Sequence, residues 1–182
     1  MSITSNQQLI DYMAQQPVKF IHFWGHQPAK SGVTKSCFSQ WYQAPFSDGE
    51  HEFLTAEHYM MYHKAMLFDN QQIAANILAC QHPNEAKQWG RKVRDFDEAR
   101  WNAARFDIVV QGNYLKFTQH AELKAFLLNT GERILVEASP VDNIWGIGLA
   151  ADDAHSEQPQ HWRGLNLLGY ALMAVREQLR AA

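Results

Sequence analysis

The segment from Thr55 to Ala65 holds the side chains best suited to chemistry, because it places a carboxylate and an amine at a regular spacing. Thr55 is a favourable N-cap, so the segment predicts a helix that runs to about Phe68. Glu57 and Lys64 are seven residues apart and therefore fall within about 20° of each other around such a helix. One helix face would then offer both groups to a ligand between them. In the alternative interpretation, Glu57 complements the helix N-terminus and Lys64 is solvated.

Two arginines beside glycines are candidate phosphate ligands. Arg91 follows Gly90, and Arg163 precedes Gly164. A neighbouring glycine lets an anion approach the backbone, and a guanidinium group binds phosphate oxygens in a bidentate manner. Because most arginines lie on protein surfaces, neither residue indicates a phosphate site by itself.

Metal and dinucleotide motifs are weak in this chain. His58 and His63 are five residues apart, which is about 140° around a helix, and the other histidines show no paired ligand spacing. The stretch Gly146–Ala151 fits a relaxed dinucleotide pattern, but it does not directly follow a strand and the residues after it hardly build a helix. We therefore expect no metal and no cofactor. The stretch is better interpreted as a turn that presents Asp142 and Trp145.

Composition narrows the class of protein further. The chain has 182 residues, of which 46% are hydrophobic and 19% charged, and its formal net charge is −3. This apolar content can close the core of one globular domain and is unlike that of a disordered chain. The slightly acidic balance lacks the basic surface by which most proteins hold duplex DNA, although it allows a local cationic pocket for one phosphate.

The sequence also predicts a location. No apolar run approaches the roughly 20 residues of a membrane span, and residues 1–8 lack the basic start and apolar stretch of a secretory signal. Two cysteines, Cys37 and Cys80, are too few for a disulfide framework. We therefore expect a cytoplasmic protein without a membrane partner, whose oligomeric state the sequence does not fix.

Hydrophobic periodicity and turn residues predict the elements that must position these groups. In the first part of the chain we expect a helix between Ser5 and Pro17, a strand at 18–24, a loop at 25–35, and short strands at 38–42 and 51–54. From residue 55 onward helices dominate. They are expected at 55–68, after an Asp69 cap, from Pro83, from Asp97 to beyond Leu115 with a weak point at Gly112, at 121–129, and at 165–180. A strand at 133–138 and a long polar connection at 140–162 complete the prediction.

Seven blocks spread over roughly residues 20–180 share their order and spacing with one known family. They are Phe38-Ser39; Thr55-x-Glu57-His58-Tyr59-x-x-x-x-Lys64-Ala65; Gly90-Arg91; Trp101; Lys116-Phe117 with His120-x-x-Leu123; Ser139-Pro140-x-Asp142-x-x-Trp145-Gly146-x-Gly148; and Asn166-x-Leu168-Gly169-x-x-Leu172-Met173-x-x-Arg176. Together these blocks resemble the NADAR family, the YbiA-like proteins.

The resemblance implies a helix-rich α+β fold, a single domain with a few short β-strands at residues 18–182 that follows a helical extension at residues 1–17. It also implies an N-glycosidase. YbiA-like members are linked to hydrolysis of ribosylaminopyrimidine phosphates, early intermediates of riboflavin biosynthesis. Other members are linked to removal of ADP-ribose from modified guanine in DNA. Gln40 stands where many relatives have Asn, and Ile147 where the YbiA protein has Asp, so the reaction class is better supported than the substrate.

The resemblance extends to the residues of the site. Glu57 would stabilise the positive charge that develops on ribose C1 and the ring oxygen, and Lys64 would attack C1 and form a Schiff base. Asp142 would bond a ribose hydroxyl or orient water, and a two-carboxylate mechanism would instead pair it with Glu57. The other candidates would bind substrate, by stacking, by contact with phosphate or as members of the shared blocks. They are Trp101, Trp145, Arg91, His58, Ser39, Gly146, Gly148 and Asn166.

Two further functions fit the same residues. One is a module that binds ADP-ribose or NAD without hydrolysing it. The other is a hydrolase for ADP-ribosylated guanine, since a flipped or single-stranded nucleotide needs only a local groove and stacking aromatic rings. The basic residues available for such a groove cluster in sequence: Lys87, Arg91, Lys92, Arg94, Arg100 and Arg105. The same residues also suit a solvated helical surface.

Overall fold

The computed structural model describes residues 2–182 and divides the chain into two compact units. The central unit is Gln40–Ala121, and the terminal unit combines the residues up to Ser39 with Glu122–Ala182. Over the described residues there are seven α-helices and four short strands. The predicted helix-rich α+β class with few short strands is therefore confirmed. None of the helices among residues 2–182 combines the length and apolar content that a membrane crossing requires.

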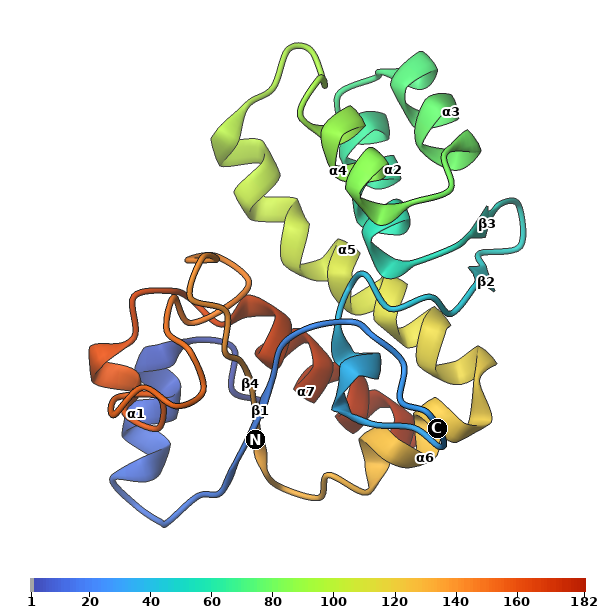
Figure 1. The fold of residues 1–182 in the computed structure, drawn as a ribbon. Coiled ribbons are helices and arrows are strands. Elements are labelled where there is room, and N and C mark those ends of the chain that lie inside the picture. Colours follow the sequence, from blue (N-terminus) through green and yellow to red (C-terminus); the bar gives the residue numbers. More distant parts are fainter. Residues whose placement is uncertain (1) are drawn as a thin grey trace. The chain divides into compact units, whose positions relative to one another are not determined.

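The central unit is a helical cluster beside a small hairpin (Figure 1). Strands β2 (Phe46–Ser47) and β3 (Glu52–Phe53) pair antiparallel. Helix α2 (Ala56–Leu67) packs against α3 (Gln71–Ala79), α4 (Pro83–Gly90) and α5 (Glu98–Gln119). Phe46, Phe53 and Tyr59 form a buried aromatic cluster that ties the hairpin to α2. These contacts make α2 the central helix of this unit.

Capping and close packing fix α2 and α5 in the central unit. Thr55 caps α2 as expected, since its Oγ1 accepts a hydrogen bond from the backbone N–H of His58 at 3.3 Å. Asp97 caps α5 in the same way. Gly112, the expected weak point of α5, lies where an added Cβ would come within 2.5 Å of the Tyr59 ring. The glycine costs some helix propensity but allows α5 to approach α2 closely.

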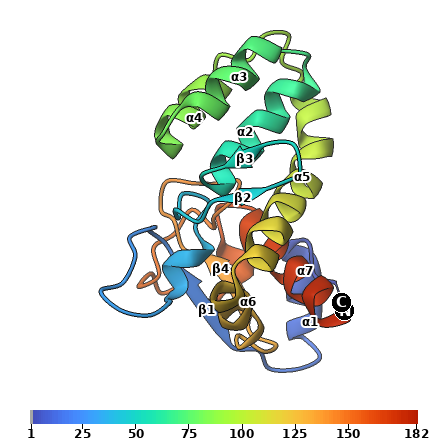
Figure 2. The ribbon, with the colours of Figure 1, turned by 90° about the vertical axis from the view of Figure 1, so that its right-hand side faces the viewer.

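The terminal unit is built around a two-stranded parallel sheet (Figure 2). Strand β1 (Phe20–Phe23) pairs with β4 (Ile134–Glu137), and helix α7 (Leu167–Ala181) packs against β4. The strand predicted at 18–24 and the helix predicted at 165–180 are confirmed within a few residues. Gly169 faces the carbonyl oxygen of Leu135 so closely that an added Cβ would clash with it. A glycine in the first turn of α7 therefore permits the helix to dock on the strand.

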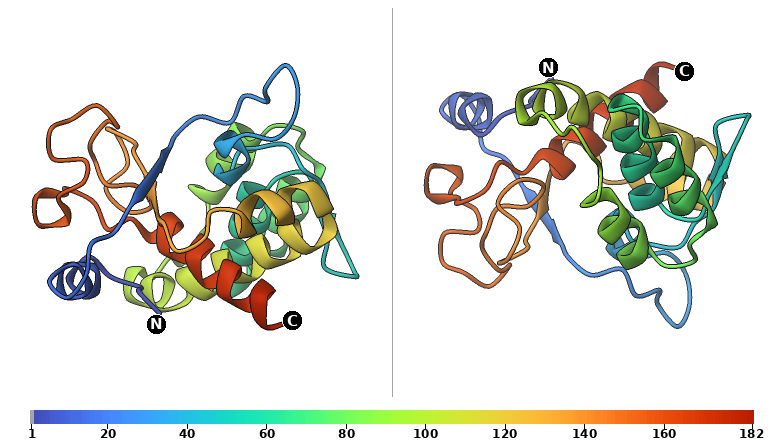
Figure 3. Two further views of the ribbon diagram at one scale, coloured as in Figure 1. Left: turned by 90° about the horizontal axis from the view of Figure 1, so that it is seen from below. Right: turned by 90° about the horizontal axis from the view of Figure 1, so that it is seen from above.

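Helix α1 (Asn6–Met13) belongs to the terminal unit, where it lies beside the 3-10 helix η2 (Pro159–His161) (Figure 3). The Asn6 side chain donates to the carbonyl of Gly164 at 2.9 Å and accepts from the Tyr170 hydroxyl at 2.8 Å. Helix α6 (Ala121–Leu128) precedes β4. The boundary expected at residue 17 stays a prediction, although these two bonds attach α1 to later parts of the unit.

Two local predictions are wrong. Residues 38–42 do not form a strand: a 3-10 helix, η1 (Lys35–Phe38), is followed by turns. The apolar side chain at position 38 reflects packing in the core, where the Phe38 ring contacts Phe23 and Phe126. It does not reflect the alternation of a strand. Asp69 does not cap α3 either, since the helix begins after Asn70 and Asp69 adopts a positive φ of 55°.

Candidate functional site

Helix α2 places Glu57 and Lys64 on one face, as their spacing predicts. Glu57 lies in the first turn, where the positive end of the helix favours a carboxylate. Its side chain is only 5% exposed, and its backbone N–H donates to the carbonyl of Gln40 at 2.9 Å. The start of the helix therefore holds this carboxylate in a fixed, largely dehydrated position.

Lys64 lies in a half-buried aromatic setting. Its Nζ is 4.8 Å from the centre of the Phe96 ring and 5.7 Å from that of Trp101. Burial lowers the pKa of Lys64 below its ordinary value of 10.5; the Glu57 charge opposes this shift and the Arg91 charge adds to it. A larger share of the amine is thus neutral, and able to attack an electrophile, than in a solvated lysine.

Arg91 stands at the end of α4, which is pressed against α2. Gly90 faces the side chain of Met61 so closely that a Cβ would clash with the thioether sulfur, and Met61 lies between Glu57 and Lys64 on α2. The Arg91 side chain itself is exposed, yet its charge acts on Lys64. An exposed guanidinium close to the amine can bind the phosphate of a substrate.

Phe96 is a candidate that the sequence patterns did not reveal. It is 45% exposed, which is unusual for a large aromatic side chain, and its ring also contacts Phe68 at 5.4 Å. Asp95, just before it, adopts a positive φ of 58° in the loop between α4 and α5. Such backbone strain in a non-glycine residue is frequent at functional sites. A phenylalanine between charged residues in a short polar loop was the available signal.

Replacement of Phe96 by alanine should weaken substrate binding. Base stacking on an aromatic ring contributes about 1–3 kcal/mol, so KM should rise roughly 5- to 150-fold. Phe96→Tyr should keep KM within a few-fold, because the ring remains. Steady-state kinetics with both variants checks this, and an unchanged KM in Phe96→Ala would remove the residue from the site.

His58 is committed to the fold, although the shared blocks suggest a role in substrate binding. It is buried, and its Nδ1 lies 2.7 Å from Thr55 Oγ1 while its Nε2 lies 3.2 Å from the carbonyl of Cys80. Burial is also the main reason that its pKa is lowered. Both ring nitrogens therefore have hydrogen-bond partners within the fold, and the histidine links the start of α2 to the end of α3. Residues 2–182 contain no group of three or more His, Cys, Asp or Glu side chains placed to hold a metal.

The candidates from residue 139 onward lie in the terminal unit, and so does Ser39. Asp142 Oδ1 accepts the backbone N–H groups of Ile144 at 2.9 Å and Trp145 at 2.8 Å. This carboxylate therefore shapes the turn that presents the half-buried Trp145 ring. Ser39 is half-buried at the end of η1, where its backbone N–H bonds the carbonyl of Ser36.

Three further candidates of the terminal unit have clear structural roles. A Cβ on Gly146 would lie 2.9 Å from the Glu137 carbonyl oxygen, and Gly148 has a φ of +69°. Asn166 is fully buried; its Oδ1 accepts from the backbone N–H of Glu137 at 3.0 Å and its Nδ2 donates to the carbonyl of Leu135 at 3.0 Å. The close approach at Gly146, the positive φ of Gly148 and the two hydrogen bonds of Asn166 explain why the fold needs these residues. A contact with substrate stays a prediction for each.

Comparison with known proteins decides the family. The model of one family, described as the NADAR domain, matches residues 22–180 of the chain. The chain belongs to the NADAR family. The match includes both units of the NADAR chain and every candidate site residue, so the family assignment made from the shared blocks is confirmed.

Relatives of this NADAR chain include proteins that are named for an activity or for a pathway. An N-glycosidase of Acanthamoeba polyphaga mimivirus is 43% identical over 165 residues, which are 88% of this chain and 96% of the viral protein. The riboflavin biosynthesis protein PYRR of Zea mays, a chloroplastic protein, is 32% identical over 145 residues, 75% of this chain but 22% of the maize protein. The solution NMR structure of the Escherichia coli protein YbiA matches with a TM-score of 0.71 at 28% identity, covering 90% of this chain and 86% of that one.

Proposed function

We propose that this protein hydrolyses the N-glycosidic bond of a ribosylaminopyrimidine phosphate. Family membership and the N-glycosidases among its relatives support the reaction class, a hydrolase acting on N-glycosyl bonds. The name of the maize relative, which concerns riboflavin biosynthesis, supports the substrate. The observation that carries the mechanism is a buried carboxylate on the same helix face as a half-buried lysine whose pKa is lowered.

Glu57 acts on the ribose. As the bond from C1 to the base nitrogen breaks, positive charge develops on C1 and the ring oxygen. A carboxylate stabilises that charge most effectively where water is excluded. Glu57 is nearly inaccessible to solvent and is held by the first turn of α2, so it needs no reorganisation when the charge appears.

Lys64 supplies the nucleophile. Its neutral amine attacks C1, the base leaves, and a proton of the amine passes to the departing base nitrogen. Opening of the ribose ring then gives a Schiff base between C1 and Nζ. Water adds to C1 and expels the lysine, which releases the ribose phosphate. The net reaction consumes one water molecule per bond cleaved and regenerates the amine.

Neighbouring side chains suit recognition of the remaining parts of the substrate. The exposed Phe96 ring can stack on a flat base. Arg91 is exposed and close enough for its charge to act on Lys64, so it can neutralise the phosphate. Trp101 is buried, only 8% exposed, and lies against the lysine, which suits it to shielding the amine more than to stacking on substrate.

One assay distinguishes this function from the two others. Purified protein is given a ribosylaminopyrimidine phosphate or an ADP-ribosylated guanine oligonucleotide, and released ribose phosphate or ADP-ribose is measured. We expect release from the first substrate. Release only from the second would favour the DNA hydrolase, for which Lys87, Lys92 and Arg100 are available over the rings of Trp41, Trp89 and Phe68. Calorimetric binding of ADP-ribose without release from either substrate would indicate a binding module.

A further inference from the structure

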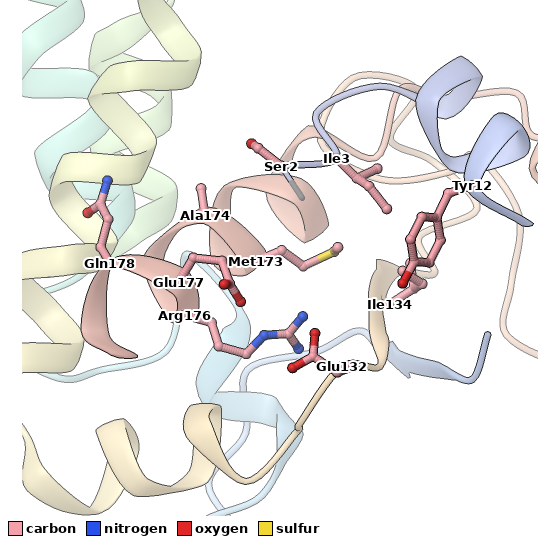
Figure 4. A pocket seen from close by; sticks show the side chains of 10 residues that line it. All are labelled: Ser2, Ile3, Tyr12, Glu132, Ile134, Met173, Ala174, Arg176, Glu177 and Gln178. Atoms are coloured by element: carbon pink, nitrogen blue, oxygen red, sulfur yellow. The ribbon is translucent and has the colours of Figure 1, made fainter. Parts of the chain in front are cut away.

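The terminal unit contains a pocket of about 410 Å³ to which the central unit contributes no residue. It is formed by the N-terminal segment with α1, by residues around the start of β4 and by one face of α7 (Figure 4). Its volume lies within the range of small-molecule sites. The side chains that line it include Tyr12, Glu132, Ile134, Met173, Arg176 and Glu177.

Arg176 is the unusual side chain of this pocket. It is 2% exposed, and its Nη1 donates to Thr130 Oγ1 at 2.8 Å and to the carbonyl of Arg133 at 2.9 Å. Its Nε is buried and has no hydrogen-bond partner among the described residues. A buried donor without an acceptor is costly, and more so on a charged group. The Nε edge of the guanidinium is thus left for an acceptor that the folded chain does not provide.

The carboxylates near Arg176 are already paired with another arginine. Arg180 Nη1 lies 2.8 Å from Glu132 Oε1 and 2.6 Å from Glu177 Oε1. The charges that act on Arg176 are those of these three residues and of Arg133, whose side chain bonds only backbone carbonyls. The charged residues that line the pocket are therefore Arg176 and two glutamates that are already paired with Arg180. Among residues 2–182, no carboxylate forms an ion pair with Arg176 itself.

The rest of the lining is suited to an apolar body. Ile3, Ile134, Met173 and Ala174 contribute aliphatic surface, and Tyr12 lies at the opposite side of the pocket from α7 (Figure 4). A phosphate monoester carries close to two charges at neutral pH, so the two glutamates of the lining would repel it more strongly than they would repel a singly charged anion. A carboxylate carries one charge and matches the planar edge of a guanidinium.

We propose that this pocket binds a small organic carboxylate with an aromatic or branched aliphatic body, whose carboxylate bonds Arg176. The pocket is a second ligand site, separate in its residues from the proposed catalytic face of α2. A ligand there would give the buried Arg176 guanidinium the acceptor that it lacks. The same molecule would contact α1, β4 and α7.

Phenylacetate tests the proposal, with phenylacetamide as a neutral probe of the same shape and phenyl phosphate as a dianion. Titrations of the full chain are followed by heteronuclear NMR. We expect saturable shifts at Ile134, Met173 and Tyr12, with phenylacetamide and phenyl phosphate each at least about tenfold weaker, because the charge-assisted bond is lost or the anion is repelled. Equal binding of the amide, shifts confined to α2, or no saturation would overturn the proposal.

Two variants keep the test independent of folding and of catalysis. Ala174→Leu narrows the pocket and leaves the hydrogen-bond partners of Arg176 in place, so it should weaken binding and reduce the shifts, whereas Arg176→Lys should weaken binding if the variant folds. Lys64→Met alters the proposed catalytic face and should bind phenylacetate as the unmodified protein does. Loss of binding in Lys64→Met, or full binding in Ala174→Leu, would place the probe elsewhere. This outcome does not depend on whether the protein is an N-glycosidase.

Discussion

Glu57→Gln should lower kcat by roughly 100- to 10,000-fold while substrate still protects the protein against thermal unfolding. The amide has nearly the shape of the carboxylate but lacks the charge that stabilises the oxocarbenium-like transition state. Because the residue is 5% exposed, water cannot substitute for the missing charge. Single-turnover assays of ribose phosphate release measure the chemical step, and thermal shift with substrate measures binding.

Two variants make this result specific. Glu52→Gln, at an exposed position of β3, removes an equal charge from the same unit and should leave kcat within twofold. Asp142→Asn keeps an oxygen that can accept the two backbone bonds of its turn and removes only the charge. A large loss of activity in Asp142→Asn would support the two-carboxylate mechanism, and full activity of Glu57→Gln would exclude a catalytic role for Glu57. Removal of a first-turn carboxylate in a buried setting costs up to about 2 kcal/mol of stability, so thermal unfolding of each variant without substrate is measured as well.

Lys64→Arg should lower kcat at least about 100-fold, although the positive charge is retained. A guanidinium group cannot form a Schiff base and is never neutral in proteins. Borohydride added during turnover of the unmodified protein should reduce the Schiff base and attach the sugar phosphate to Lys64, which peptide mass spectrometry would locate. Lys92→Arg is the matched control, because Lys92 Nζ also lies over an aromatic ring, 4.4 Å from the centre of Trp89, but the side chain is exposed.

The pH dependence of kcat/KM adds a second measurement at the same residue. The reactive form of Lys64 is the neutral amine, so kcat/KM should rise with pH. It should level off once the pH exceeds the pKa of Lys64, which lies below 10.5. If no adduct forms while substrate is cleaved and Lys64→Arg remains active, the Schiff-base mechanism fails and direct attack by water takes its place.

The sequence was most informative where a local pattern determines the structure. Thr55 and Asp97 are N-caps because their side chains satisfy backbone donors three residues away, and this requires no knowledge of the tertiary fold. The common face of Glu57 and Lys64 follows in the same way from helix geometry. The resemblance to a family then contributed the reaction, which no spacing could indicate.

Tertiary contacts explain what could not be predicted. An apolar residue beside polar ones predicts a strand at Phe38, whereas its ring packs against Phe23 and Phe126, which are distant in sequence. Phe96 was missed because only the folded chain shows that it is exposed and lies over the lysine. The shared blocks predict a substrate contact for His58, yet its Nε2 bonds the carbonyl of Cys80 at the end of another helix.

The two bonds of Asn166 have a consequence for how copies of this chain behave at high concentration. On β4, the N–H of Glu137 and the carbonyl of Leu135 point away from β1, and the Asn166 amide supplies one acceptor and one donor to them. The Glu137 carbonyl accepts from Ile147 at 2.9 Å. The Asn166 side chain thereby takes the hydrogen bonds that a third strand would make. This edge of the sheet is then less available to pair with a strand of another copy, which lowers the tendency to aggregate.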